Sequence, residues 1–129
     1  MNAESGIKIF NIGDTEGIET GEGIMKPFLV TDNVSLIHLE IPAGMNITPH
    51  AHSRQGLLYC LNGELEIVSR NERFIIAGGT AAVVFPDIAI GVNNNSDSSA
   101  NCLLISSPPA FKSAEELKER LKQIGVKNK

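Results

Sequence analysis

Between residues 34 and 107 the sequence is a series of short β-type segments separated by turn residues, with no helical pattern among them. The clearest segment, 35–41, mixes alternating polarity with β-branched residues and ends at Pro42-Ala43-Gly44. Further strands are expected over 56–67, 74–76, 80–85 and 102–106. Short strands with regular turns are typical of a sandwich or barrel, so the sequence predicts an all-β domain.

The dipeptide Asn62-Gly63 divides the segment 56–67 into two strands. This dipeptide is most typical of a tight hairpin turn, so a hairpin is expected here. By contrast, residues 11–23 are rich in glycine and acidic residues and favour a loop. The chain is therefore divided into an irregular lead-in with the first strands (1–33), a barrel core (34–107) and a C-terminal helix (113–124).

The C-terminal helix has clear start and stop signals. Ser113 and Glu116 form a capping box, and Leu117, Leu121 and Ile124 recur at helical spacing before Gly125. The apolar stripe is narrow and the polar face has mixed charge, which favours packing on the barrel or on a partner subunit rather than on a membrane.

Bulk properties restrict the possible functions. The 129 residues are most simply one domain, and the net charge of −4 without a basic patch outside the C-terminal tail argues against a nucleic-acid partner. No apolar run is long enough to span a membrane, and the first six residues lack the features of a signal peptide. A cytoplasmic location is therefore expected.

The expected core includes both cysteines and the aromatic residues. Cys60 and Cys102 lie inside apolar segments and do not form a CxxC motif, so they are interpreted as two buried thiols rather than a disulfide. The phenylalanines are also expected in the core: Phe10, Phe28, Phe74, Phe85 and Phe111.

Two histidines are the strongest candidates for a functional site. In Pro49-His50-Ala51-His52 the imidazoles at i and i+2 of an extended segment point to the same side, close enough to share one ion. Imidazole is a suitable ligand for zinc, copper, iron and nickel. The third histidine, His38, alternates with apolar residues and is interpreted as facing outward or as a hydrogen-bonded wall residue.

The residues around this pair resemble the first motif of the cupins. The resemblance covers Ile41-Pro42-Ala43-Gly44, the pair His50 and His52, and Leu58 to Leu65 with its Gly63. A weaker second motif follows as Gly79, then Phe85 to Gly91, then Asn95. The resemblance implies a cupin double-stranded β-helix, a jelly-roll barrel, here with one C-terminal α-helix.

The resemblance also implies a metal site, but this chain lacks half of it. Cupins usually bind their metal with the two first-motif histidines, a glutamate and a second-motif histidine. His50 and His52 fall on the first two positions, whereas Gly56 falls on the glutamate and Gly91 on the second-motif histidine. The expected cofactor is therefore one divalent transition metal ion (Zn, Fe, Ni or Mn) or none, with Gln55, Cys60 or Asn93 as auxiliary ligands.

The cupin topology also places even-numbered residues from His50 to Cys60 on one face, with Arg54 in the pocket. Missing side chains at Gly56 and Gly91 would enlarge that pocket, which suits a small anionic or hydroxylated ligand. On the opposite face the apolar Tyr59 and its neighbours Leu57 and Leu61 predict a homodimer contact. The alternative is that the N-terminal segment or the C-terminal helix covers this face.

These features predict a small-molecule-binding cupin with a degenerate metal site. The alternative is a metal-dependent cupin enzyme, an oxygenase, isomerase or lyase, acting on a small polar or aromatic substrate. A third class, a mainly structural or interaction protein, stays open because the fold hosts many functions. The sequence does not decide whether the chain is an enzyme.

Overall fold

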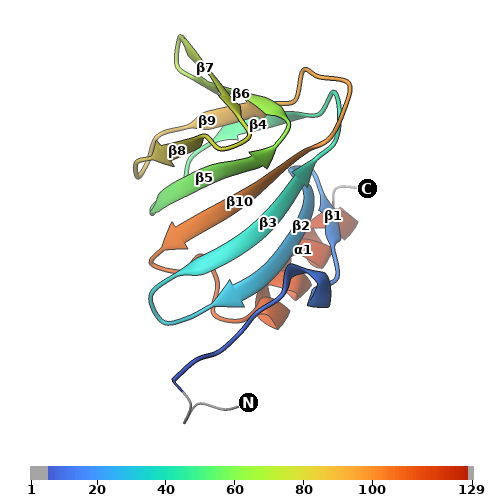
Figure 1. Cartoon of the computed structure of the whole chain (residues 1–129), viewed down its shortest axis with the longest axis vertical. Helices are drawn as coiled ribbons and strands as arrows, with labels where there is room; N and C mark the ends of the chain where they lie inside the picture. Colours follow the sequence, from blue (N-terminus) through green and yellow to red (C-terminus); the bar gives the residue numbers. More distant parts are fainter. Residues whose placement is uncertain (1–5, 128–129) are drawn as a thin grey trace.

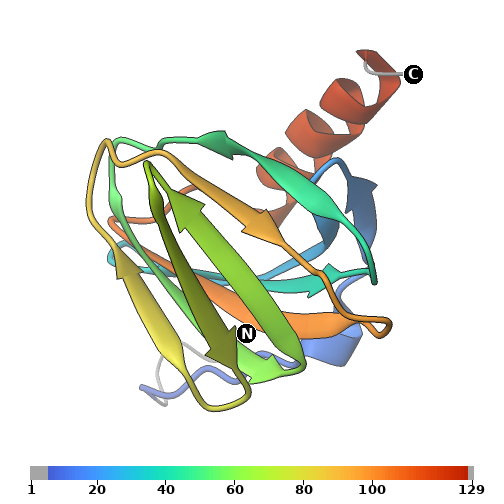
Figure 2. The ribbon, with the colours of Figure 1, turned by 90° about the horizontal axis from the view of Figure 1, so that it is seen from above.

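Two antiparallel sheets lie on either side of the core of the computed structural model, which describes residues 6–127 and the side chains of residues 6–122 (Figures 1 and 2). The larger sheet has the order β1 (Ile18–Thr20), β2 (Gly23–Val30), β3 (Ser35–Ile41), β10 (Ala100–Ser107), β5 (Gln55–Asn62), β8 (Ala81–Val84). The smaller sheet has the order β4 (Asn46–His50), β9 (Ile90–Asn93), β6 (Glu64–Ser69), β7 (Glu72–Ala77). The predicted all-β class is confirmed.

The alternation read from the sequence sets the inner faces of the strands. In β3 every second residue from Ser35 to Ile41 is buried, whereas the residues between them are only half-buried. The same period of two applies in β6, where Leu65 and Ile67 are buried. Side chains from both sheets therefore form one apolar core.

The structure differs from the expected hairpin at Asn62-Gly63. β5 pairs with β10 and β8, whereas β6 pairs with β7 and β9, so the chain passes from one sheet to the other at this point. Gly63 has a φ of 89°, and a Cβ there would lie 2.7 Å from the Cα of Ala100. Glycine is needed for a tight corner beside β10, not for a hairpin.

The lead-in is more regular than its composition predicts. A short 3-10 helix, η2 (Ile12–Asp14), begins after Asn11, whose side chain accepts a hydrogen bond from the amide of Gly13. β1 then pairs with β2, and β2 pairs with β3. The barrel therefore begins before residue 34, because both strands belong to the larger sheet.

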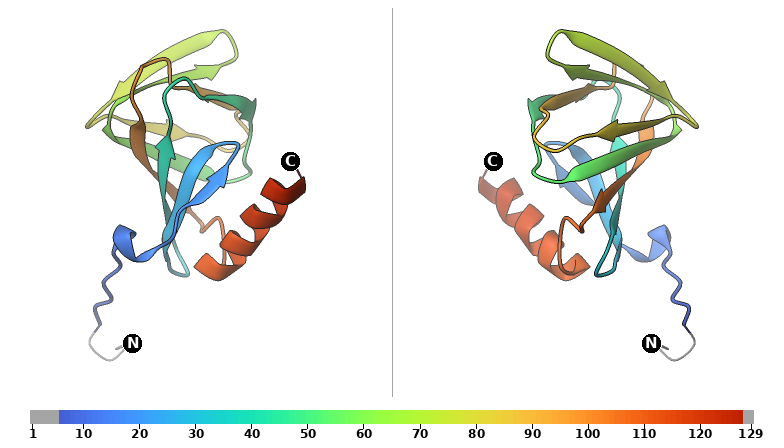
Figure 3. Two further views of the ribbon diagram at one scale, coloured as in Figure 1. Left: turned by 90° about the vertical axis from the view of Figure 1, so that its right-hand side faces the viewer. Right: turned by 90° about the vertical axis from the view of Figure 1, so that its left-hand side faces the viewer.

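The C-terminal helix α1 (Ala114–Lys127) packs beside β1 and β2 (Figure 3). The amide of Glu116 donates to Oγ of Ser113, so the predicted cap is confirmed. Leu117 is buried, whereas the side chain of Ile124 lies outside the described residues. The helix continues past Gly125, contrary to the expected end. None of the helices described is long and apolar enough to cross a membrane.

The expected aromatic core is only partly correct. Phe111 is buried, but Phe74 and Phe85 are 48% and 62% exposed beside the two edge strands β7 and β8. Cys60 and Cys102 are both buried free thiols and are direct partners across β5 and β10. Burial raises the pKa of both, that of Cys102 to about 12, so neither is a reactive thiolate near neutral pH.

Candidate ligand-binding site

A cavity of about 450 Å³ lies between the two sheets and extends to α1. Its wall is mostly aliphatic and includes residues from β3, β5, β9 and β10. The main apolar residues of the wall are Ile37, Leu39, Ile41, Ile47, Leu58, Ile88, Ile90, Val92, Leu104, Leu117 and Leu121. The cavity is therefore a continuation of the apolar core, open at one end.

Charged and histidine side chains of this cavity come from separate parts of the chain. They are Glu22, His50, His52, Arg54 and Arg120. Glu22 lies in the turn between β1 and β2, the histidines and Arg54 at or just after the end of β4, and Arg120 on α1. A few polar groups around an apolar cavity are typical of a small-molecule site.

Glu22 is the residue that the sequence did not indicate. Its Oε1 lies 3.2 Å from Nε2 of His50. The turn that carries it is fixed by Thr20, whose hydroxyl donates to the carbonyl of Gly23 at 2.8 Å and accepts from the amide of Glu22 at 3.0 Å. Because residues 11–23 gave no strand pattern, nothing in the sequence placed this acidic residue near the histidines.

His50 has a hydrogen-bond acceptor at each ring nitrogen. Nδ1 lies 3.0 Å from the carbonyl oxygen of Thr48, and Nε2 faces the Glu22 carboxylate. A carbonyl oxygen and a carboxylate both accept hydrogen bonds, so these two contacts fix the orientation of the His50 ring.

The two histidines lie side by side, as the sequence predicts. Their ring centroids are 4.9 Å apart and the ring planes are nearly perpendicular, at 85°. Burial lowers the pKa of His52, with further lowering by His50 and Arg54, and Glu22 acts in the opposite direction. The lowered pKa favours the neutral form of His52.

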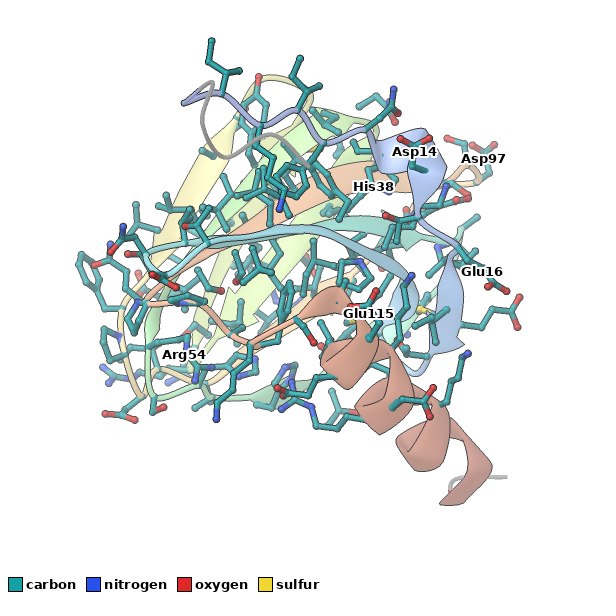
Figure 4. The ribbon with its side chains drawn as sticks, turned by 90° about the horizontal axis from the view of Figure 1, so that it is seen from below. Asp14, Glu16, His38, Arg54, Asp97 and Glu115 are labelled. Carbon is teal, nitrogen blue, oxygen red and sulfur yellow. The ribbon has the colours of Figure 1, made fainter. Side chains whose placement is uncertain are left out.

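Arg54 has an unmet hydrogen-bond donor. Its Nε is buried and has no hydrogen-bond partner among the residues that the structure describes. The side chain borders the cavity and lies far from His38 in Figure 4. His38 itself is on the outer side of β3, between Lys26 and Leu103 of the neighbouring strands, so its outward orientation is confirmed.

The three auxiliary candidates lie away from the cavity. Gln55 is exposed and pairs in regular register with Ser107, so the bulge needed to turn it inward does not form there. Cys60 is buried in the core, with its Sγ 3.4 Å from the carbonyl oxygen of Asn62. Asn93 is hydrogen-bonded to Glu66 at 3.1 Å. None of the three borders the cavity.

The structure moves the second cupin motif by one residue. Ile90 and Val92 line the cavity, whereas Gly91 lies against Pro49 and the carbonyl of Ile47. The inward histidine position is therefore Ile90, not Gly91, and Gly91 does not enlarge the cavity. With this shift, the second glycine position of the motif falls on Asp87, which has a φ of 65°. The first glycine position of the motif then coincides with Gly79.

The buried asparagine of the motif supports this new register. Asn94 is fully buried, and its Nδ2 donates to the carbonyl oxygens of Ile41 and Ser98, each at 2.9 Å. Its Oδ1 accepts from the amide and hydroxyl of Ser96. Asn95, by contrast, is exposed. The motif asparagine is therefore Asn94, which joins the loop before β10 to β3.

The residues at the site do not fit the metal centre that the cupin fold implies. The glutamate position is Gly56 and the second histidine position is Ile90, and both border the cavity without a ligand atom. His50 is bonded at both nitrogens. Within the described part of the chain, no group of three His, Cys, Asp or Glu side chains is arranged to hold a metal ion.

No family model and no curated protein matches this sequence. Solved structures do match it. KdgF from Halomonas sp. gives a TM-score of 0.71 at 18% identity, covering 79% of this chain and 94% of that chain. The polyketide cyclase RemF from Streptomyces resistomycificus gives 0.70 at 15% identity, covering 83% and 87%.

A third structure, an RmlC-like cupin from Shewanella frigidimarina NCIMB 400, gives a TM-score of 0.69 at 18% identity. It covers 79% of this chain and 92% of that chain. A further match, from Klebsiella pneumoniae, is described as having a double-stranded β-helix domain. These identities are low, so the likeness concerns the fold. With its two sheets, its inward histidine pair and these neighbours, the chain has the double-stranded β-helix fold of the cupin superfamily.

Proposed function

We propose that this protein binds a small molecule in the cavity between its two sheets. The observation that carries the proposal is the cavity of about 450 Å³, with an apolar wall and a few polar side chains at one end. This volume lies within the range of small-molecule sites in proteins, roughly 300–1,000 Å³. Gly56 borders the cavity, and the absence of a side chain there leaves part of this space open.

Structural neighbours support a small-molecule role of this kind. They include proteins named as a polyketide cyclase, KdgF and a predicted oxalate decarboxylase. The alternative, a metal-dependent oxygenase, isomerase or lyase, would need ligands that this site does not bring together. Binding is therefore the function that the side chains support best.

A fluorescence binding assay tests this proposal with 1-N-phenylnaphthylamine, a neutral apolar dye that fluoresces when it leaves water. The Gly56→Leu variant should fill the cavity, since a Cβ at Gly56 meets only the carbonyl oxygen of Ile105, at 4.0 Å. The matched control is Glu64→Leu, at an exposed position of β6. We expect Gly56→Leu alone to lose the dye signal. Unchanged dye binding in Gly56→Leu would contradict the proposal.

We also propose that the protein is a homodimer through the outer face of the larger sheet. Neighbouring strands there place Leu103 beside Tyr59, and Leu57 between Ile105 and Val83. Tyr59 is 37% exposed, and α1 packs on β1 and β2 rather than over this face. The N-terminal segment projects away from the sheet in Figure 3. A second copy is the simplest cover for these apolar side chains.

A further inference from the structure

We infer that the ligand is an amphipathic organic monoanion, with an apolar body in the cavity and one carboxylate-like head group bound by Arg54. This inference rests on the proposed binding function and adds the chemical class of the ligand. It follows from the composition of the wall, the unmet donor on Arg54 and the balance of charges at the open end. These three observations are independent of one another.

The wall excludes ligands with many hydroxyl groups. Aliphatic side chains from both sheets and from α1 surround the cavity, and Ser106 is the sole buried hydroxyl among its described lining residues. A buried polar group without a hydrogen-bond partner is costly. A sugar-like ligand would leave most of its hydroxyl groups unpaired here, whereas an alkyl or aromatic body would bury apolar surface.

Arg54 provides the head-group site. Its buried Nε lacks an acceptor among the described residues, and the guanidinium forms no ion pair with them. A buried N–H donor without an acceptor is unfavourable until an acceptor arrives. A carboxylate matches the planar guanidinium with two parallel hydrogen bonds, so an anionic group would satisfy Nε and a terminal nitrogen together.

The charges around the cavity allow one anion. Oε1 of Glu22 already contacts Nε2 of His50 at 3.2 Å, and Arg120 lies 3.8 Å from Glu116 on the same helix. Among the described residues that line the cavity, Arg54 is therefore the cation that has no anionic partner. A second carboxylate on the ligand would have to lie in the apolar wall or near Glu22, and both are unfavourable.

The experiment compares compounds that share a ten-carbon chain and differ in their head groups. Decanoate, decanol, decanedioate and decyltrimethylammonium are each titrated against 1-N-phenylnaphthylamine in the presence of the wild-type protein. Because charge-assisted hydrogen bonds are roughly twice as strong as neutral ones, decanoate should bind at least about tenfold more tightly than decanol. Decanedioate and decyltrimethylammonium should bind more weakly than decanoate.

Arginine variants assign the head-group site. Arg54→Gln should remove the preference for decanoate over decanol. Arg73→Gln is the matched control, since Arg73 is exposed, pairs with Glu66 at 2.9 Å and does not border the cavity. It should retain the preference. Thermal unfolding of each variant verifies that the fold is intact.

The outcomes separate this inference from the proposed function. If the dye and decanol bind but decanoate has no advantage, the ligand class is wrong and the binding function stands. An equal loss of preference in Arg73→Gln would show a general charge effect and overturn the assignment to Arg54. If neither the dye nor any ten-carbon compound binds to the wild-type protein, the proposed function itself fails.

Discussion

The carboxylate of Glu22 lies 3.2 Å from Nε2 of His50, so the turn between β1 and β2 supplies an acidic group to the open end of the barrel. The glutamate position of the cupin motif is Gly56, on β5. The site therefore has a carboxylate, but it comes from the turn between β1 and β2 and already contacts one histidine. This contact occupies one ring nitrogen of the histidine pair that the sequence indicated as metal ligands.

Replacing Glu22 with glutamine should lower the pKa of His52 further, because the Glu22 carboxylate raises it. Stability should change by less than about 1 kcal/mol, since the pair is largely exposed to solvent. NMR titration of the His52 ring measures the shift. Glu19→Gln, at an exposed position on β1, is the control and should leave His52 unchanged. A rise in the His52 pKa in Glu22→Gln would contradict the arrangement.

His38 should make the protein less stable in mild acid. Burial lowers its pKa, Lys26 lowers it further and Glu40 acts in the opposite direction. The unfolded chain then binds a proton at higher pH than the folded chain does. The contribution of neutral His38 to the stability of the fold is fully present above the pKa of the unfolded chain, about 6.5. This contribution is lost as the pH falls below that value toward the lower pKa of the folded chain. Urea unfolding at about pH 7.5 and about pH 5.5 measures this loss.

His38→Leu should show a smaller loss between the same two pH values. The substitution removes the titrating ring and its unpartnered buried Nδ1, and it places an aliphatic side chain beside Leu103. His52, whose pKa is also lowered, still contributes to the remaining slope. A variant with the full wild-type loss would show that His38 is not responsible.

Gly56→Glu combined with Ile90→His should create a metal site with four protein ligands. A Cβ at Gly56 has room, and Ile90 borders the cavity. With His50 and His52 the variant has four potential ligands, enough for about one zinc ion per chain. Elemental analysis of untagged protein measures the ion. The wild-type protein should contain much less than one ion per chain.

The register of the second motif gives this experiment a control. In the double variant Gly56→Glu with Gly91→His, the Cβ of the new histidine would lie 3.0 Å from Cγ of Pro49 and 3.1 Å from the carbonyl oxygen of Ile47. It should neither bind the ion nor fold as stably. Equal metal binding by both double variants would contradict the register, and a full ion in the wild-type protein would favour the enzyme alternative.

Asn94→Ala should destabilise the protein strongly. The substitution leaves the buried carbonyl of Ile41 without its side-chain donor and removes the hydrogen bonds of Asn94 to Ser98 and Ser96, which together cost about 2–4 kcal/mol. Asn95→Ala is the neighbouring control, because its amide is exposed and lies 3.5 Å from Glu66, so it should cost about 0.5 kcal/mol or less. Denaturant unfolding compares them. Similar values would mean that Asn94 is not the structural asparagine.

Tyr59→Glu should convert the proposed homodimer to a monomer, because it places a charge among apolar side chains of the outer face. Ile75→Glu is the control, since Ile75 is an exposed apolar residue on β7, in the other sheet. Size-exclusion chromatography with light scattering measures the mass. A wild-type protein that elutes as a monomer at high concentration would refute the proposal.

Sequence patterns over a few residues correctly predicted the features that depend on near neighbours in the chain. The alternation of 35–41 became β3 with the expected bounds, and Ser113 caps α1 as its sequence indicates. The spacing of His50 and His52 placed their rings 4.9 Å apart. At Asn62-Gly63 the turn was correctly located, but a local pattern does not show which strands pair on either side of it.

The sequence by itself determined the all-β class, the C-terminal helix and the paired histidines, because periodicity, capping and spacing act over a few residues. Only the tertiary structure decided which charges meet. Glu22 reaches His50 because β1 and β2 join the larger sheet, and Ile90 rather than Gly91 faces the cavity because of the strand register. Contacts between distant segments depend on sheet pairing, and a one-residue shift in register reverses every side chain.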